Sequence, residues 1–305
     1  MKYKRLAHTP LSFSAIGLGG WPFCSGYDWG NKSALDVSSL LSVALERGIN
    51  WVDTAPVYEG SEHAIGIALK GRREKLFVAT KCGLVKNGAW TDHNLRTIQT
   101  QLETSLKSLQ TDYIDLYQIH YPDPQFPLLE ALEQLSRLQA QGKLRAIGVC
   151  NLTPAQVDTL PRNVCSLQSP FSLVRPAREH VNVCKQKEIS FIAYGALHGG
   201  VLSGKYKNAP NLRRADARNY FYKGYKGDEF VGLMPLVLRM KQLAKKYECT
   251  SAQIALAWVL NQTEGFVLAG AKTTAQVIEN SLSCEVQITP ADLHFLEEGY
   301  ATKCI

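Results

Sequence analysis

The chain has 305 residues, of which 45% are hydrophobic and 20% charged, and its 34 basic and 27 acidic residues give a formal net charge of +7. This composition is typical of an ordinary globular protein, and it excludes a disordered, collagen-like or small disulfide-stapled chain. The positive charge is modest and forms no long basic run. It therefore fits an anionic small molecule better than a nucleic acid, which requires clustered basic side chains. The length is compatible with two domains or with one large α/β barrel.

The N-terminus and the cysteines indicate a cytoplasmic protein. No apolar segment follows the basic start of the sequence, so we expect no signal peptide, and no apolar run is long enough to span a bilayer. The 8 cysteines are scattered singly without a C-x-x-C pair, which predicts reduced thiols. Neither they nor the 7 histidines have the spacing of metal ligands, and we expect no metal site.

Short β-branched runs alternate with amphipathic segments almost from end to end. In chain order, strands are expected at residues 15–19, 50–54, 76–81, 113–120, 146–151, 166–171, 189–197 and 266–270. Helical patterns are found at residues 32–47, 92–109, 127–141, 178–187, 231–247 and 274–284. Two further helix starts have typical caps, because Thr153 precedes a proline and Thr273 precedes Thr274.

Eight strands, each followed by a helix, predict a parallel sheet, and eight repeats favour a closed (β/α)8 TIM barrel over an open doubly wound sheet. The distribution of polar residues supports the barrel. Six different strands have a polar residue at or near their C-terminal ends, namely Asp53, Lys81, His120, Asn151, Gln168 and Tyr194. In an open sheet, the binding crevice lies only at the point where the strand order reverses, so it is served by the few strands beside that point. Side chains from six different strands therefore converge only if the strands form a ring. We predict one α/β barrel domain over residues 1–305.

The stretch 205–228 interrupts the alternation with aromatic and basic residues that have no clear periodicity. A loop of this length inside a compact domain is usually a lid or a binding loop, although a solvated surface excursion is the alternative. Its arginines, Arg213, Arg214 and Arg218, suggest a substrate that carries a phosphate, a carboxylate or many hydroxyls.

Four residues at one end of the predicted barrel have the chemistry of a carbonyl reductase. The phenol of Tyr58 is a poor proton donor at neutral pH unless a cation such as Lys81 lowers its pKa, and Asp53 would hold that lysine charged and oriented. His120 could then hydrogen-bond the carbonyl oxygen under attack. Each residue alone is more often structural, so the prediction depends on the combination at the catalytic face.

The segments 53–58, 61–62, 79–81, 112–120 and 142–151 closely resemble the aldo-keto reductase superfamily. The likeness covers essentially the whole chain in the family's order, and it is closest to the bacterial branch with short C-terminal tails, which includes general-stress and sugar-related oxidoreductases. The resemblance implies a TIM barrel that binds NADP(H) in an extended form without a Rossmann domain.

The resemblance also implies the catalytic roles. Tyr58 would be the general acid and base, Lys81 would lower its pKa, Asp53 would pair with Lys81, and His120 would orient the substrate carbonyl. The residues implied to contact the substrate are Trp21, Tyr58, His120 and Tyr121.

For the cofactor, the resemblance implies that Asn151 and Gln168 bind the nicotinamide carboxamide and that Tyr194 stacks on the ring. Other implied cofactor contacts are Gly20, Trp21 and Asp53 near the first strands, and Gly195, Leu197, Gly204 and Lys205 around the pyrophosphate. The adenosine end would be held by Gly270, Lys272, Thr273, Gln276, Glu279 and Asn280. This last segment is a strand end that runs into a helix N-terminus, a natural anion site, and Lys272 there favours NADPH over NADH.

One departure from the family pattern concerns Cys150, which stands where a serine is common and is expected to weaken one hydrogen bond to the carboxamide. The expected function is NADPH-dependent reduction of aldehydes or ketones, including sugar-derived or anionic carbonyls, by a monomer or weak homo-oligomer with no nucleic-acid or membrane partner. One alternative is a sugar-modifying enzyme that uses bound NADP transiently for elimination or epimerisation. A second is a non-enzymatic NADP(H)-binding module that docks on a partner.

Overall fold

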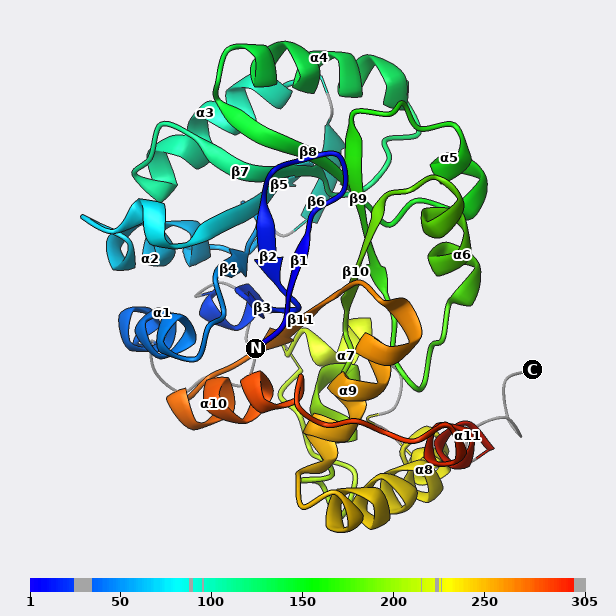
Figure 1. Ribbon diagram of the computed structural model, residues 1–305. Helices are drawn as coiled ribbons and strands as arrows, with labels where there is room; N and C mark the ends of the chain where they lie inside the picture. Colours follow the sequence, from blue (N-terminus) through cyan, green and yellow to red (C-terminus); the bar gives the residue numbers. More distant parts are fainter. Residues whose placement is uncertain are drawn as a thin grey trace.

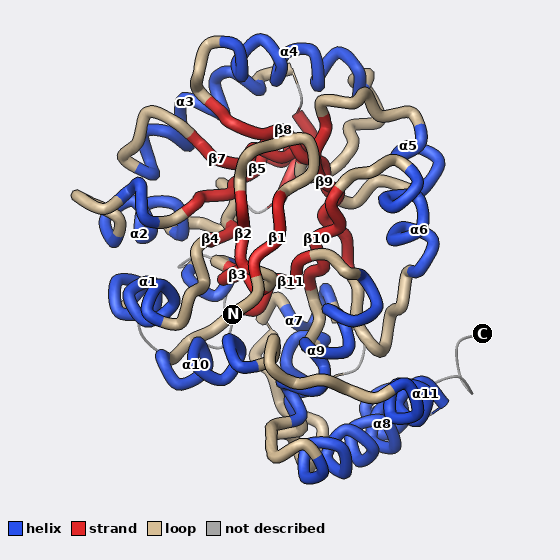
Figure 2. Tube along the Cα trace, viewed as in Figure 1, coloured by secondary structure: helices blue, strands red, loops and turns tan. Residues whose placement is uncertain are grey.

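A closed barrel of eight parallel strands forms the centre of the computed structural model, which describes residues 1–24, 35–87, 90–94, 96–214, 216–222, 225 and 227–298. The barrel strands are β3 (Ile16–Gly19), β4 (Trp51–Asp53), β5 (Phe77–Asn87), β7 (Ile114–Ile119), β8 (Leu144–Cys150), β9 (Val164–Pro170), β10 (Ser190–Tyr194) and β11 (Phe266–Gly270). They pair in the order β4, β3, β11, β10, β9, β8, β7 and β5, and a β4–β5 pairing closes the ring. Figure 2 shows these strands gathered inside a ring of helices. The predicted (β/α)8 barrel is confirmed.

Helices surround the barrel (Figure 1). Those of the ring are α1 (Val37–Glu46), α2 (Ser61–Ala68), α3 (Ile98–Leu109), α4 (Leu128–Ala140), α5 (Pro154–Asp158), α6 (Arg178–Gln186), α9 (Ser251–Thr263) and α10 (Thr274–Leu282). Beyond the ring, α8 (Gly227–Lys246) and α11 (Pro290–Glu298) pack against each other. Short helical turns are η1 (Trp21–Phe23), η2 (Arg73–Lys75), η3 (His198–Ser203) and α7 (Arg218–Phe221).

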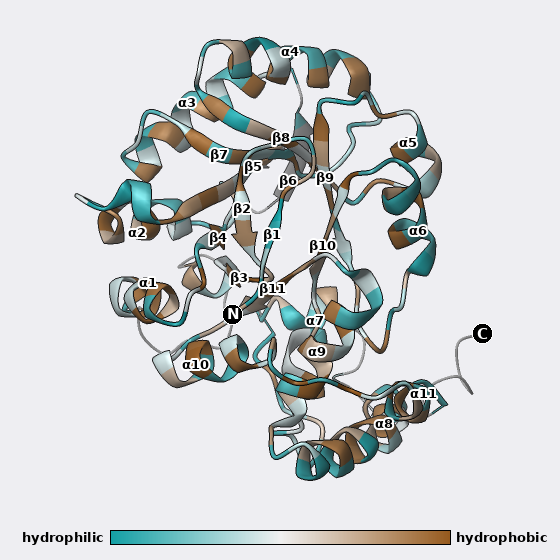
Figure 3. Cartoon of the chain, in the orientation of Figure 1, coloured by the Kyte–Doolittle hydropathy of each residue, from teal (hydrophilic) through white to brown (hydrophobic). Residues whose placement is uncertain are grey.

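The ring helices form because each places an apolar stripe on the barrel. On α4 the buried residues are Ala131, Leu132, Leu135 and Leu138, which recur at helical spacing and face inward. Figure 3 shows the resulting alternation of hydrophobic and hydrophilic stretches along α4. By contrast, α9 is buried on nearly every side, so its sequence has no polar face to reveal a period.

A short antiparallel hairpin covers the N-terminal ends of the barrel strands. It consists of β1 (Tyr3–Arg5) and β2 (Ser12–Ser14), which the sequence did not predict. The ring of Phe13 lies 5.0 Å from those of Trp51 and Phe77, at the starts of β4 and β5. The hairpin therefore closes one end of the barrel with aromatic side chains, and the opposite end is where the polar strand ends lie.

Several predicted boundaries were wrong, among them the end of the strand expected at 76–81, which runs on to Asn87, and the start of the helix expected at 231–247, which begins at Gly227. The helix expected at 92–109 begins only at Ile98, because Trp90–Asn94 forms a strand, β6, that pairs antiparallel with the extended end of β5. The strand expected at 189–197 ends at Tyr194, since Gly195 turns the chain with a φ of 70°. The first helix, expected from residue 32, begins at Val37, and residues 32–34 lie outside the described part. Among the described residues, no helix combines the length and the apolarity that crossing a membrane requires.

Candidate active site

The polar residues at the strand ends do meet, as predicted. Asp53, His120, Asn151, Gln168 and Tyr194 belong to or directly follow five different strands, and all of them line one cavity of about 300 Å³ at the C-terminal end of the barrel. The sixth, Lys81, is 1% exposed and lies beneath this cavity in the barrel interior.

A buried ion pair forms the floor of the cavity. The ammonium nitrogen of Lys81 lies 2.5 Å from Asp53 Oδ1 and donates a second hydrogen bond to the backbone oxygen of Thr54, at 2.8 Å. The other carboxylate oxygen, Asp53 Oδ2, accepts hydrogen bonds from the side-chain amides of Gln118, at 3.0 Å, and Gln168, at 2.9 Å. Asp53 is therefore held on both oxygens by groups from three other strands.

The phenol of Tyr58 stands on the loop after β4, between this ion pair and His120. Lys81 Nζ lies 5.1 Å from the centre of the Tyr58 ring, and the His120 ring lies 6.1 Å away and perpendicular to it, at 89°. Burial, reinforced by the negative charge of Asp53, raises the pKa of Tyr58 well above its ordinary value. The role expected for Lys81, lowering the pKa of Tyr58, stays a prediction.

Aromatic rings form the wall beside Tyr58. Trp21 stacks on Tyr58 with ring centres 5.4 Å apart and an angle of 8°, and Phe221 meets Trp21 edge-on at 4.9 Å. Tyr121 stacks on His120 at 5.2 Å. Next to Trp21, the backbone of Gly20 packs closely against that of Asp53, because a Cβ on Gly20 would lie only 2.8 Å from the Asp53 backbone oxygen. The predicted substrate residues therefore surround the cavity together with Phe221, which the sequence did not single out.

Asn151 and Gln168 present complementary hydrogen-bonding atoms to the cavity. The side-chain oxygen of Asn151 accepts a hydrogen bond from the Tyr194 hydroxyl at 2.8 Å, and its side-chain nitrogen donates one proton to the His120 backbone oxygen at 2.9 Å. The second proton on that nitrogen is then left to donate into the cavity. Gln168 donates through Nε2 to Asp53 Oδ2 and Gln118 Oε1, so its carbonyl oxygen Oε1 remains. A donor beside an acceptor is the arrangement that pairs with a carboxamide.

Cys150 does not occupy the position expected for a carboxamide ligand. Its thiol is fully buried, and Sγ lies 3.7 Å from Gln118 Oε1 inside the barrel. The expected weakening of a carboxamide hydrogen bond therefore has no support in this geometry. Burial raises the pKa of the Cys150 thiol, which keeps it in its unreactive protonated form.

The cavity continues from Tyr194 toward α10. Gly195, Leu197, Lys205, Gly270, Lys272, Gln276, Glu279 and Asn280 line this extension, whereas the predicted contacts Gly204 and Thr273 are not among its lining residues. Thr273 instead caps α10, because its hydroxyl accepts from the Gln276 backbone N–H. A helix N-terminus with a lysine beside it is suited to hold a phosphate.

Comparison with known proteins identifies the family. Residues 15–300 match the model of the aldo/keto reductase family. The chain belongs to this family. Aldo-keto reductase YhdN of Bacillus subtilis (strain 168) is 36% identical over 290 residues, which cover 91% of this chain and 87% of that protein. The NADH-specific methylglyoxal reductase of Escherichia coli (strain K12) is 29% identical over 326 residues, which cover 98% of each chain.

A solved structure supports the same assignment. The glycerol dehydrogenase from Gluconobacter oxydans superposes with a TM-score of 0.89 at 29% sequence identity, over 99% of this chain and 96% of that one. The barrel, the cavity and the family thus agree on an oxidoreductase of the aldo/keto reductase family.

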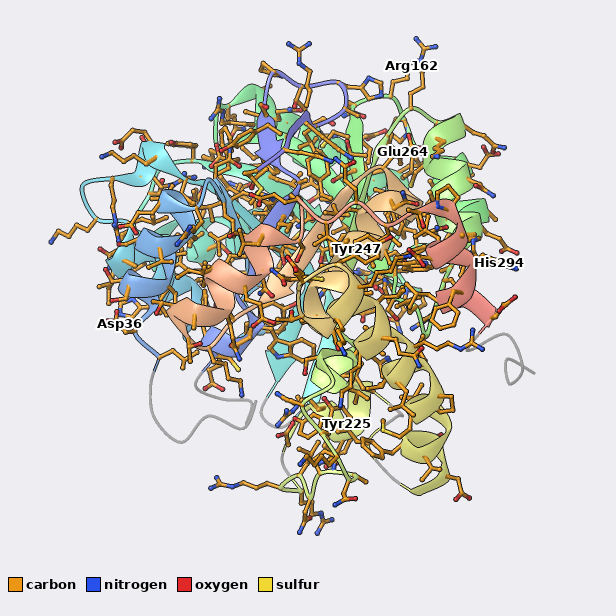
Figure 4. The ribbon with its side chains drawn as sticks, turned by 60° about the horizontal axis from the view of Figure 1, so that its bottom comes forward. Asp36, Arg162, Tyr225, Tyr247, Glu264 and His294 are labelled. Carbon is orange, nitrogen blue, oxygen red and sulfur yellow. The ribbon has the colours of Figure 1, made fainter. Side chains whose placement is uncertain are left out.

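In this aldo/keto reductase family member, the described part of the loop 205–228 packs beside the cavity. The Arg218 guanidinium is buried and forms two hydrogen bonds with Asp216, at 2.8 and 2.6 Å, and a third with the Tyr206 hydroxyl at 3.1 Å. Tyr225 lies at the base of the loop, next to α8 (Figure 4). Because Asp216 balances the charge of Arg218, the arginine is not the unbalanced cation that the sequence suggested for an anionic substrate. Arg213 and Arg214 are exposed and are not among the residues that line the cavity.

Proposed function

We propose that this protein reduces aldehydes or ketones with NADPH, with Tyr58 as the general acid. The observation that carries the proposal is the convergence of Tyr58, His120 and the Asp53–Lys81 ion pair on a single cavity. No nucleophile paired with a base lines this cavity among the described residues, so acyl transfer is not supported.

Tyr58 is suited to deliver a proton. Its raised pKa keeps the phenol protonated at neutral pH, and the loss of that proton leaves a phenolate directly above the Lys81 ammonium group. The fixed positive charge of Lys81 offsets part of the cost of forming this phenolate in a buried site, because it is already in place when the proton leaves. When bound, the nicotinamide cofactor supplies the hydride, while His120 and Tyr58 hold the carbonyl oxygen between them.

The residues around the cavity fit a nicotinamide dinucleotide. Asn151 offers an N–H to the carboxamide oxygen, and Gln168 offers Oε1 to the carboxamide NH₂. At the other end, Lys272 directly precedes the N-cap of α10, where a 2′-phosphate would bind favourably, and Lys205 also lines the cavity. This supports NADPH rather than NADH, even though the relative in Escherichia coli is named NADH-specific.

The substrate side of the cavity supports a small carbonyl compound. Its walls include the aromatic rings of Trp21, Tyr121 and Phe221. Two described cations lie nearby and each is paired with a carboxylate, since Arg218, which also lines the cavity, pairs with Asp216, and Lys81 beneath it pairs with Asp53. The described cysteines are free thiols, which supports a cytoplasmic protein. A monomer or weak homo-oligomer remains part of the proposal.

An absorbance assay at the NADPH band tests the proposal with a panel of small aldehydes, ketones and phosphorylated or keto sugars. NADPH and NADH are compared as reductants. We expect the Tyr58→Phe variant to lose at least about a thousandfold in kcat, the order reported for removing a positioned proton donor, while NADPH still binds. The matched control is Tyr220→Phe, since Tyr220 is 70% exposed.

Two results would argue against the proposal. Turnover that survives in the Tyr58→Phe variant would remove Tyr58 as the acid. Tight NADPH binding with no net oxidation by any carbonyl would favour the alternatives, either transient cofactor use on a sugar or a cofactor-binding module that docks on a partner.

A further inference from the structure

Three side chains inside the barrel form a closed ring of hydrogen bonds beneath the candidate active site. Gln118 Nε2 donates to Asp53 Oδ2 at 3.0 Å, and Gln168 Nε2 donates both to Asp53 Oδ2 at 2.9 Å and to Gln118 Oε1 at 3.2 Å. Gln118 is fully buried, and Gln168 and Asp53 are each 3% exposed. Such a ring is well protected from water, which would otherwise compete for its hydrogen bonds.

The neighbouring strand leaves room for Gln118. Gly148 on β8 is the register partner of Gln118 on β7, and a Cβ on Gly148 would lie 3.0 Å from Gln118 Cγ. Two residues further along β8, Cys150 is the register partner of Gln168 on β9, and its Sγ lies 3.7 Å from Gln118 Oε1. The side chain of Gln118 thus fills a space that the absence of a side chain on Gly148 leaves open.

The chemistry of the ring fixes which way each amide points. A carboxylate only accepts hydrogen bonds, so both glutamines must turn their NH₂ groups toward Asp53. Gln118 Oε1 then faces Gln168 and takes its second amide proton. Since both protons of Gln168 Nε2 are committed inside the barrel, Gln168 can offer the cavity only its carbonyl oxygen.

We propose that Gln118 is a positioning residue of this active site. By taking the second amide proton of Gln168, it acts together with Asp53 to hold Gln168 in the orientation that accepts a hydrogen bond from the cofactor's carboxamide NH₂. This inference rests on the proposed function, because it requires a nicotinamide cofactor in the cavity. It adds a residue two positions before His120 that touches neither cofactor nor substrate, and acts through Gln168 and Asp53.

Binding measurements with two oxidised cofactors test the proposal. One is NADP⁺, and the other is its 3-acetylpyridine analogue, in which a methyl ketone replaces the carboxamide and no NH₂ can donate. Dissociation constants are measured by calorimetry on the purified full chain. We expect the unaltered protein to prefer NADP⁺ by about tenfold, the order of one buried hydrogen bond. In the Gln118→Met variant this preference should shrink to about threefold or less, because Gln168 loses one of the two hydrogen bonds that hold its amide and is fixed less firmly.

Two further variants separate positioning from simple damage. Gln118→Glu, in its protonated form, can donate to Asp53 through one oxygen and accept from Gln168 through the other, so it should keep the preference for NADP⁺. Gln101→Met also deletes a buried glutamine, one that binds the Gly83 backbone N–H at 2.8 Å outside the barrel lumen, and it should keep the preference too. Loss of the preference in all three variants would show a structural effect and overturn the proposal.

The remaining outcomes distinguish failure of the Gln118 proposal from failure of the proposed function. An unchanged preference in Gln118→Met, or no preference in the unaltered protein, overturns the role of Gln118 and leaves the Tyr58 chemistry standing. Failure of the unaltered protein to bind NADP⁺ at all would overturn both.

Discussion

At the scale of single residues, Gly148 shows how completely the barrel interior is filled. A Cβ at this position would lie 2.5 Å from Ser166 Oγ, 3.0 Å from Gln118 Cγ and 3.2 Å from Leu116 Cδ1. We expect Gly148→Ala to lower the free energy of unfolding by about 1–3 kcal/mol, because extra volume in a packed core forces its neighbours out of their preferred positions. Chemical denaturation measures this change.

The closest of these contacts can be removed to check the cause. Adding Ser166→Ala deletes the hydroxyl that the new methyl would meet, so the double variant should be more stable than Gly148→Ala alone. Gly232→Ala is the matched control. Nothing lies within 4 Å of its added Cβ, and alanine in this helix should stabilise the protein slightly. Independent, additive effects of Gly148→Ala and Ser166→Ala would contradict the steric explanation.

The position of a residue in its strand decided whether the sequence could reveal it. Asp53, His120 and Asn151 were found because polar residues at the ends of apolar strands stand out. Gln118 stands inside a strand whose six residues are all buried, and no local pattern separates it from a structural glutamine. Only the packing of three strands shows that its amide meets Asp53.

At the scale of elements, a partly buried histidine, His198, stands at the contact between η3 and the loop 205–228. Burial, and to a lesser extent the charge of Arg175, lowers the pKa of His198 to about 4. Its ring meets that of Tyr222 edge-on at 5.3 Å, so protonation would place a charge between η3 and the loop. The folded protein therefore resists taking up this proton.

We predict a loss of stability in mild acid from this one group. The unfolded chain binds the proton near its ordinary pKa of about 6.5 and the folded chain only near about 4, so the free energy of unfolding falls as the pH drops between these values. At about 1.4 kcal/mol per pKa unit, the full effect is about 3 kcal/mol at most. Denaturation curves at a series of pH values measure it.

The control for this prediction is His198→Asn, which cannot titrate and tolerates the positive φ of 47° found here. Acidic residues change stability over the same pH range in both proteins, so the difference between the two curves isolates His198. Parallel pH curves for the two proteins would show that His198 stays accessible to protons in the fold.

Element boundaries were predictable only where they depend on local sequence. β11 was predicted with its observed bounds, since a short apolar run there ends at a glycine. The sequence missed β6 because its residues pair with an extension of β5 that no local pattern marks. It missed β1 and β2 because strands of three residues are too short for an alternating pattern to emerge.

At the scale of the whole molecule, the barrel separates an end that closes the fold from an end that holds the site. The hairpin residue Phe13 is fully buried among Trp51, Phe77 and Phe266 at the N-terminal ends of the strands. Phe221 stands at the other end, 58% exposed and edge-on to Trp21. The same substitution at these two positions should therefore have opposite consequences.

We expect Phe13→Ala to lower the free energy of unfolding by about 3–5 kcal/mol, because it leaves a cavity among aromatic rings, while kcat and KM stay within about twofold of the unaltered protein. Phe221→Ala should change stability by less than about 1 kcal/mol, as expected for a side chain with little burial. It should nevertheless raise KM for carbonyl substrates severalfold, since it removes the support behind Trp21. Chemical denaturation and steady-state kinetics on both variants measure the two effects. If Phe13→Ala altered KM as strongly as Phe221→Ala, the two ends would be coupled through the strands, and the barrel would not insulate its catalytic end from its closed end.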